Sequence, residues 1–524
     1  MRWLGLVGAA ALAACGSEPD PRGGTCVDPP RGPDMTRLAD VTAESGVDFV
    51  YENPLFQGGG LAVADLDGDD LPELVATRRR GGAMVFHNLG GMRFAPRPDS
   101  GVPSDLAANA IAAADLDNDG DRELVLATFD ATVVFANDGA GGFREVVRFA
   151  DSGTTEHVLP VDLDGDGLLD LYLSNYDLRD EVKTQNRVLM NRGGLAFAPA
   201  VVGGAGLSWT ATAFDVDDDG DQDLYIANDT LLADYGTGEL SGPVLYPVDL
   251  FLRNDGPGAD GAPVFTDIAE ELGLTRPRSS MGGVLHDFDD DGRLDLYVPD
   301  LGADKVFVRD ANGGFVDRAP ELGLAATERV NKYCEGPART EECLVMSWSG
   351  AIVDFDLDGD DELLVVNGET TPFDIPPVTM FARDGALPYR ELSPTLPCMD
   401  ARAQVATDLD GDGDQDLAIA YVNGPLAIFE DRGTPAPSAW LRVVLRGSTS
   451  NRDGLGAVVT VRTTRRTVQR VVGHGGVVHA SLPAEAHVGL GADVVEAVEV
   501  RWPSGTRSEL TGPLTGTVVV DEMR

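Results

Sequence analysis

Seven short acidic loops recur along the chain, and this repeat restricts its possible folds more than any other feature. In each loop aspartate stands at positions one, three and five, and an aspartate or glutamate stands at position nine. Position six is glycine in every copy except the first, which has Asp70. Several copies of one unit in a long chain indicate a repeat architecture.

The four acidic positions of the loops are Asp65, Asp67, Asp69 and Glu73; Asp115, Asp117, Asp119 and Glu123; Asp162, Asp164, Asp166 and Asp170; Asp215, Asp217, Asp219 and Asp223; Asp287, Asp289, Asp291 and Asp295; Asp354, Asp356, Asp358 and Glu362; and Asp408, Asp410, Asp412 and Asp416. An EF-hand would add a glutamate at position twelve and a helix on each side. Position twelve is never acidic here; it is Ala76, Leu126, Leu173, Ile226, Val298, Val365 and Ile419. The loops are therefore not EF-hands.

The flanks of the loops predict strands. Small residues precede each loop, as in GGGLAVADLD, and a β-rich run such as LYLSN follows it. A second strand, a glycine turn and a segment that commonly begins with phenylalanine complete a unit of four short strands. Such units stacked around an axis form a β-propeller, and small residues suit the innermost strand, where the blades crowd together. We expect an all-β fold, with a seven-bladed β-propeller carrying calcium loops over residues 37–435.

The loops favour calcium as their ligand. Ca²⁺ takes about six to eight oxygen ligands in flexible geometry, whereas Mg²⁺ demands a near-ideal octahedron and keeps its waters. Alternate aspartates on a tight turn direct three carboxylates inward, and the acid at position nine closes the site. Solvated acidic turns without metal are the alternative. Loop one fits least well, because Asp70 takes the glycine position and Pro72 follows.

This pattern resembles the FG-GAP or VCBS repeats of integrin-α-type propellers, whose blades bind Ca²⁺ in DxDxDGxxD loops, and the resemblance covers residues 38–433. The last region resembles a second family. NRDGLGAVVTV (451–461), HVGLG (487–491) and VEVRWPSG (498–505) are similar to the ASPIC/UnbV domain. The combination, with the opening LADVTAESGVDFVYEN (38–53), is similar to the cartilage acidic protein family. Residues 436–524 are therefore expected to form a small ASPIC/UnbV-like β domain.

Net charge is −47, and it is concentrated before the last region. Residues 437–524 contain ten arginines and eight acids, a formal +2. The acidic excess elsewhere repels nucleic acid and anionic lipid and attracts divalent cations. We therefore expect no nucleic-acid partner.

The first 15 residues, MRWLGLVGAAALAAC, indicate an export signal. Their apolar core is too short to span a membrane, and the Leu-Ala-Ala-Cys ending resembles a bacterial lipobox in which Cys15 is lipidated. An ordinary signal peptide containing a cysteine is the alternative. Residues 16–36 are rich in proline, glycine and acid, which suits a disordered tether. Gly16 after the cysteine favours the outer membrane or cell surface, with the lipid as the one contact with the membrane.

Four further cysteines remain, an even number that favours disulfides in an exported protein. Cys334 and Cys343 bracket a short loop and are expected to pair. A bond between Cys26 and Cys398 is then the expected remainder.

Two classes of function remain open. The primary one is a binding, adhesion or scaffolding module for a protein or glycan partner at the cell surface. The alternative is a propeller enzyme, such as a lyase or dehydratase, although no histidine lies in a recognised catalytic motif. A ligand face is expected at the starts of the innermost strands, where aromatic and polar residues stand six positions before six of the loops: Asn109, Glu156, Trp209, Met281, Trp348 and Arg402. Simple packing of both tryptophans between blades is the other interpretation.

The ends of the ring predict how it closes. The segment exemplified by FVDRAPELGL follows each of the first six loops but is missing after the seventh. The same pattern stands unpaired near the N-terminus as LADVTAESGVDF. Because a propeller leaves two strand edges bare unless its ends meet, we expect residues 38–49 to complete the blade of Asp408–Asp416.

Overall fold

The computed structural model describes residues 37–51, 59–150, 153–177, 184–200, 206–229, 248–259, 261–274, 279–300, 303–325, 346–368, 378–383, 385–392, 396–397, 399–433 and 439–523. Strands make up nearly all of the regular structure in these residues. The helices described are two single turns, α1 (Thr42–Ser45) and α2 (Ala319–Leu322). None of the helices in the described ranges is long and apolar enough to cross a membrane.

Seven sheets each contain one acidic loop, which joins their first two strands, and we number the sheets one to seven with their loops. Sheets one and two contain β2 (Leu61–Ala64), β3 (Glu73–Arg78), β4 (Gly82–Asn88) and β5 (Phe94–Pro96), then β6 (Ala110–Ala114), β7 (Glu123–Ala127), β8 (Ala131–Asn137) and β9 (Phe143–Ala150). Sheets three and four contain β10 (Thr155–Val161), β11 (Asp170–Asn175), β12 (Arg187–Asn191) and β13 (Phe197–Ala200), then β14 (Ser208–Phe214), β15 (Asp223–Asn228), β16 (Leu250–Pro257) and β17 (Pro263–Asp267).

Sheets five and six contain β18 (Val284–His286), β19 (Asp295–Val298), β20 (Lys305–Arg309) and β21 (Phe315–Asp317), then β22 (Met346–Val353), β23 (Glu362–Gly368), β24 (Thr379–Ala382) and β25 (Arg390–Leu392). Sheet seven contains β26 (Ala401–Thr407), β27 (Asp416–Tyr421), β28 (Leu426–Asp431) and β1 (Leu38–Asp40). Neighbouring strands within these units pair antiparallel, as expected for consecutive hairpins.

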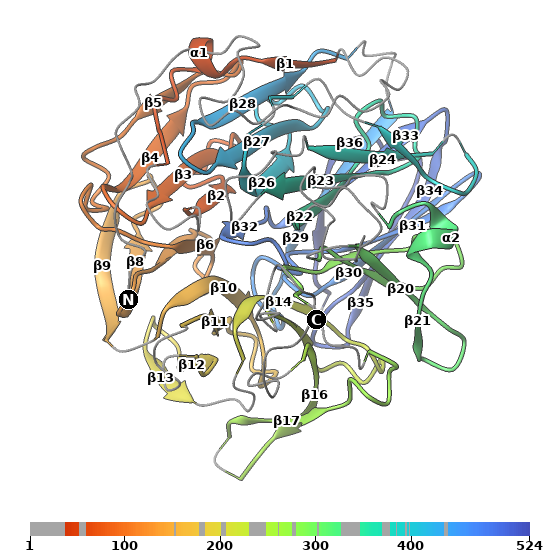
Figure 1. Cartoon of the computed structure of the whole chain (residues 1–524), viewed down its shortest axis with the longest axis horizontal. Helices are drawn as coiled ribbons and strands as arrows, with labels where there is room; N and C mark the ends of the chain where they lie inside the picture. The colour runs from red at the N-terminus through yellow and green to blue at the C-terminus, as the bar shows by residue number, and fades with distance from the viewer. Residues whose placement is uncertain are drawn as a thin grey trace, which may run out of the picture.

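The seven sheets follow one another around a common centre, in a propeller-like arrangement (Figure 1). The first strand of each sheet is the innermost, and β26 contacts β2, so the ring is closed. Small residues line this centre because neighbouring strands approach closely. A Cβ atom on Gly60 would lie 2.8 Å from Ile111 Cγ2 of the next sheet.

The predicted closure of the ring is confirmed. β1 pairs antiparallel with β28, in the register Leu38↔Asp431 to Asp40↔Phe429. Farther along, the amide of Leu426 donates to the carbonyl of Phe49 at 2.8 Å. The N-terminal segment therefore supplies the outermost strand of sheet seven and covers an edge that would otherwise be bare.

The C-terminal region forms two further sheets. One contains β33 (Glu485–Gly491), β29 (Ala439–Arg446) and β36 (Gly516–Asp521), and the other contains β31 (Thr467–Val471), β30 (Val458–Thr463), β34 (Val495–Arg501) and β35 (Arg507–Thr511). Their inward residues share one hydrophobic cluster with residues of sheets two and three, including Leu116, Leu171, Leu455 and Trp502. The remaining short strand, β32 (Ala480–Ser481), leaves these sheets and pairs in parallel with β2.

Several predictions concern residues outside the described ranges. They are the signal peptide and tether over residues 1–36, lipidation of Cys15, and the pairs Cys334–Cys343 and Cys26–Cys398. All of these stay predictions.

Candidate metal centres

The backbone of each acidic loop turns twice through the left-handed region. The residues at position four have φ between 53° and 84°, and those at position six have φ between 71° and 104°. Glycine suits such turns, and aspartate and asparagine tolerate them. Asp70 adopts φ 71°, so loop one has the same turn as the copies with glycine.

The aspartate at position one is the hydrogen-bonding centre of each loop. Its two carboxylate oxygens accept the amide of position four or five and the amide of position six. In loop three, Asp162 accepts Gly165 N at 2.9 Å and Gly167 N at 3.0 Å. Corresponding pairs of bonds occur at Asp65, Asp115, Asp215, Asp287, Asp354 and Asp408. These bonds fold the loop around the carboxylate.

The acid at position nine ties the loop to the strands behind it. In loop three, Asp170 accepts the amide of Leu163, at position two, at 3.1 Å and that of Asn191, at the end of β12, at 2.7 Å. The position-two bond is present in all seven loops: at Glu73, Glu123, Asp170, Asp223, Asp295, Glu362 and Asp416. The acid is therefore held rigidly with its charge facing the loop.

Positions three and five supply the oxygens least engaged by the protein. At position five one oxygen accepts the amide of position seven in each loop, at Asp69, Asp119, Asp166, Asp219, Asp291, Asp358 and Asp412. At position three the buried Oδ1 atoms of Asp67, Asp117, Asp164 and Asp289 have no hydrogen-bond partner. Because buried polar atoms are nearly always paired, these four oxygens fit a site for a cation or a water molecule. The other carboxylate oxygen of Asp67, Asp164 and Asp289 pairs with His87, Arg192 and Arg318, respectively.

The acids converge closely enough to share one cation. Positions one, three and nine of loops two, three and four each offer a carboxylate oxygen, and these atoms lie within 4.8 Å of one another. That span is about twice a Ca–O distance of ~2.4 Å. In loop one, Asp65, Asp67 and Asp69 form such a group. A set of oxygen ligands without sulfur fits a hard divalent cation.

Burial raises the pKa of the acids in the loops in the absence of a cation. Burial, and to a smaller extent the neighbouring carboxylates, raises the pKa of the position-nine acid in every loop. The pKa is about 7 for Glu73, Asp223 and Asp295 and about 8 for Glu123, Asp170 and Asp416, and it lies well above the usual range for Glu362. A cation would offset this by favouring the charged carboxylates.

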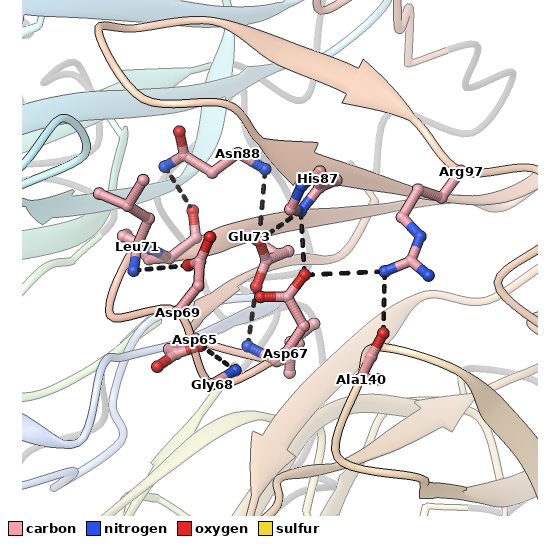
Figure 2. Close-up of polar contacts among 12 residues, drawn as sticks. Asp65, Asp67, Gly68, Asp69, Leu71, Glu73, His87, Asn88, Arg97 and Ala140 are labelled. Atoms are coloured by element: carbon pink, nitrogen blue, oxygen red, sulfur yellow. Dashed lines mark hydrogen bonds and ion pairs between the residues drawn. The ribbon is translucent and has the colours of Figure 1, made fainter.

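Loop one differs from the other loops because His87 faces it. The Nδ1 atom of His87 lies 3.1 Å from Asp67 Oδ2 and 3.2 Å from Glu73 Oε1, and Arg97 approaches the same Asp67 oxygen at 3.8 Å (Figure 2). Asp67, Glu73 and His87 form a second possible ligand group. His87 was not predicted, because the other copies have no histidine at this place.

Asparagines tie neighbouring sheets together beside the loops. Asn88 Nδ2 donates to Pro72 O within its own sheet at 2.9 Å and to Leu409 O, at position two of loop seven, at 2.8 Å. Asn137, Asn191 and Asn254 make the matching bonds to the preceding sheet, through Leu66 O, Leu116 O and Leu163 O. This recurring asparagine was visible in VFHN, VFAN, VLMN and FLRN but was not recognised as a link.

The C-terminal region lies against the loops and meets them with polar contacts. Arg501 Nη1 lies 2.5 Å from Asp215 Oδ2 in loop four. In loop two, Asp453 accepts the amide of Asp115 at 3.0 Å and pairs with Arg122 at 2.8 Å. Arg501 therefore offsets negative charge in loop four, whereas Asp453 adds a carboxylate to loop two that Arg122 balances.

The residues predicted as a ligand face are all buried: Asn109, Glu156, Trp209, Met281, Trp348 and Arg402. Trp209 and Trp348 contact each other edge to face at 5.1 Å, and the Arg402 guanidinium lies 4.0 Å from the Trp348 ring centre. They form part of the interior because residues of the C-terminal region occupy the centre of the ring, beside them. A role for these residues in binding an external ligand stays a prediction.

The fold and the repeats define the class of the protein. The FG-GAP-like repeat model matches residues 65–126 and 115–173, and the ASPIC and UnbV model matches residues 447–520. The chain therefore carries FG-GAP-like repeats in a propeller-like ring, a binding-module architecture, followed by an ASPIC and UnbV domain. The resemblance predicted from the sequence is confirmed.

Relatives among curated proteins include cartilage acidic protein 1. The Xenopus tropicalis protein is 24% identical over 504 residues, which cover 81% of this chain and 76% of that protein. The human protein is 28% identical over 297 residues, which cover 52% of this chain and 41% of that protein. This chain therefore matches less than half of the human protein.

Similar solved structures include a lectin of Agrocybe aegerita that recognises non-reducing terminal N-acetylglucosamine. It is 15% identical, with a TM-score of 0.40, and the match covers 71% of this chain and 87% of the lectin. Virginiamycin B lyase of Staphylococcus aureus is 8% identical, with a TM-score of 0.38 and a match covering 73% of this chain and 98% of the lyase. Similarity at this level carries no argument about function.

Proposed function

We propose that the protein is an exported, lipid-anchored calcium-binding protein whose ring acts as a binding or scaffolding module for a protein or glycan partner. Each acidic loop would hold one Ca²⁺ through its carboxylates at positions one, three, five and nine. The role of the ions is structural, because they neutralise acids that face one another in a rigid turn.

One observation carries the calcium proposal. In four of the loops a buried position-three oxygen, on Asp67, Asp117, Asp164 or Asp289, has no partner, while the surrounding acids are fixed by backbone amides. Solvated turns without metal would leave these oxygens exposed to water or bonded to the protein. The repetition of one hydrogen-bonding scheme in all seven loops argues against a chance arrangement.

Isothermal titration of chelator-treated protein tests the proposal. We expect several calcium sites, close to seven, and weaker binding of magnesium under the same conditions. Chelation should also lower the melting temperature, because a ligand that binds the folded state stabilises it by mass action. Two sites or fewer would overturn the proposal for the loops as a set.

Export and lipidation rest on the N-terminal sequence. Substitution Cys15→Ser should release the protein from membranes or leave its signal uncleaved. Unchanged membrane association of this variant would remove the lipid anchor from the proposal and leave the calcium sites unaffected.

A further inference from the structure

A segment of the C-terminal region passes through the centre of the ring. We call residues 472–482 (VGHGGVVHASL) the axial segment. It includes β32, which lies among β2, β6, β10 and β26 near the middle of the ring (Figure 1). Sequence reasoning placed these residues in a separate small domain and gave no signal for this position.

The axial segment is held by main-chain hydrogen bonds to the innermost strands. Leu61 N of sheet one donates to His479 O at 3.1 Å, and strands β2 and β32 continue from there as a parallel pair. In sheet four, Ala213 N donates to His474 O at 2.9 Å. Gly476 N donates to Ala211 O at 3.0 Å.

The side chains of the axial segment fill specific places in the ring. Val477 packs in one cluster with Ala403 and Val405 of sheet seven. Val478 packs in the cluster that contains Trp209 and Trp348.

His479, which follows Val478, makes a polar contact with Glu156. Its Nε2 atom lies 2.9 Å from Glu156 Oε2, and the Trp209 ring lies 6.3 Å from the imidazole. Glu156 also pairs with Arg79, and the side chains of all three members of this Arg–Glu–His chain are almost fully buried. The Glu156 carboxylate thus bridges Arg79 and His479, and the Trp209 ring lies beside the imidazole.

Two glycines stand where the axial segment approaches the backbone of sheets four and five too closely for a side chain. A Cβ atom on Gly476 would lie 2.0 Å from Gly283 O, and one on Gly475 would lie 2.8 Å from Ala211 O. Both have φ near +80°, a conformation that other residues rarely adopt. His479 itself has φ +60°, so its position is imposed by its surroundings rather than by local preference.

These contacts resemble those of a bound peptide: main-chain hydrogen bonds to the edge of a strand supply affinity, and pockets for side chains supply specificity. We propose that the centre of the ring is a binding site for an extended peptide, and that the axial segment is its resident ligand, carried by the same chain. The ligand class is a peptide with two glycines, two β-branched residues and a histidine that meets Glu156. This inference does not depend on calcium.

The axial segment belongs to the same chain as the ring, and this connection explains how the site stays filled. A tethered ligand acts at a high effective concentration, so a free peptide competes poorly with it. The parallel pairing with β2 involves two residues, and a Cβ atom on Gly476 would lie 2.0 Å from Gly283 O, so a larger side chain at position 476 should displace the segment. The site then becomes open to a peptide added from solution.

The test uses the full chain and a fluorescent synthetic peptide, VGHGGVVHASL. The variant Gly476→Val disturbs the passage, and Gly505→Val is its matched control, because Gly505 has φ +79° but no atom within 4 Å of an added Cβ. We expect saturable binding of the peptide to Gly476→Val and at least tenfold weaker binding to wild type and to Gly505→Val. Binding should fall again in Gly476→Val with Glu156→Gln.

The proposal is overturned if folded Gly476→Val binds no peptide, or if wild type binds it equally well. Circular dichroism establishes folding, and calcium titration of the same samples shows separately whether the acidic loops bind calcium. A milder variant, His479→Gly, covers the case in which Gly476→Val does not fold. Imidazole should raise the melting temperature of His479→Gly and leave wild type unchanged; no such rescue would contradict a recognition pocket at Glu156.

Discussion

Replacing Glu123 by glutamine should cost much more stability in the presence of calcium than in its absence. Glu123 is 1% exposed, and its two oxygens accept Leu116 N at 2.9 Å and Asn137 N at 3.3 Å. Burial raises the pKa of this carboxyl to about 8, so at pH 7 the group is mostly neutral when no cation is bound. Glutamine matches that charge and loses one hydrogen bond, at a cost of about 1 kcal/mol.

With calcium present, the same substitution removes a charged ligand from loop two. At a calcium concentration of about 100 times Kd, one site contributes about 2.7 kcal/mol to stability. Glu123→Gln should therefore lower the free energy of unfolding by about 3–4 kcal/mol in calcium and by about 1 kcal/mol or less in chelator.

Urea unfolding in chelator and in calcium, together with isothermal titration, measures both effects. The number of calcium sites should fall by one. Glu145→Gln on β9 of the same sheet is the control, because Glu145 is exposed and pairs only with Arg148 among the described contacts. An equal loss of stability in both buffers, or an unchanged number of sites, would refute the assignment of Glu123 as a ligand.

Three further predictions follow from the loops and their links. Because the pKa of Asp170 is raised to about 8, the folded state holds its proton more tightly than the unfolded state does. Stability in chelator should therefore fall as the pH rises from about 4 to 8. Calcium should remove this pH dependence, and melting curves at several pH values in both buffers test it. Asn88→Ala should lower the free energy of unfolding by about 2–4 kcal/mol, since it leaves buried carbonyls in sheets one and seven without a donor. Asn191→Ala removes the same set of bonds between sheets two and three and should cost as much in urea unfolding. A negligible effect of either substitution would contradict the proposed link. Asp70→Gly should stabilise loop one by about 1 kcal/mol by relieving its left-handed backbone, whereas a loss of stability would show that the Asp70 side chain has a role of its own.

The repeats made much of this fold predictable. Spacing and residue type identified the loops, and the absence of one segment after loop seven identified β1 as its replacement, now paired with β28. Such inferences succeed because each copy supports the others. The position-nine acids also occupy the same place in every loop, bonded to the amide of position two.

Features present in a single copy were not predictable in this way. His87 enters loop one from β4, and only the pairing of β3 with β4 brings it near Asp67. Leu357 adopts φ 53° at position four of loop six, where nothing in its side chain favours that turn. The insertion of the axial segment depends on contacts between regions at opposite ends of the chain, and no local pattern encodes those contacts.

Segments from the N-terminal and C-terminal parts of the described chain complete the ring. β1 covers the outer edge of sheet seven, and the axial segment fills the centre through β2, Glu156 and the two tryptophans. We expect contacts between residues so distant in sequence to form late, because the entropy of closing the long loops between them must be overcome first. Until then the edges of β28 and β2 are unpaired, and open strand edges favour aggregation. Ions that stabilise individual loops would act before closure, since each acidic loop lies within one sheet between consecutive strands. Calcium thus fits a sequential assembly, in which the loops stabilise single sheets first and the two ends of the chain close the ring last.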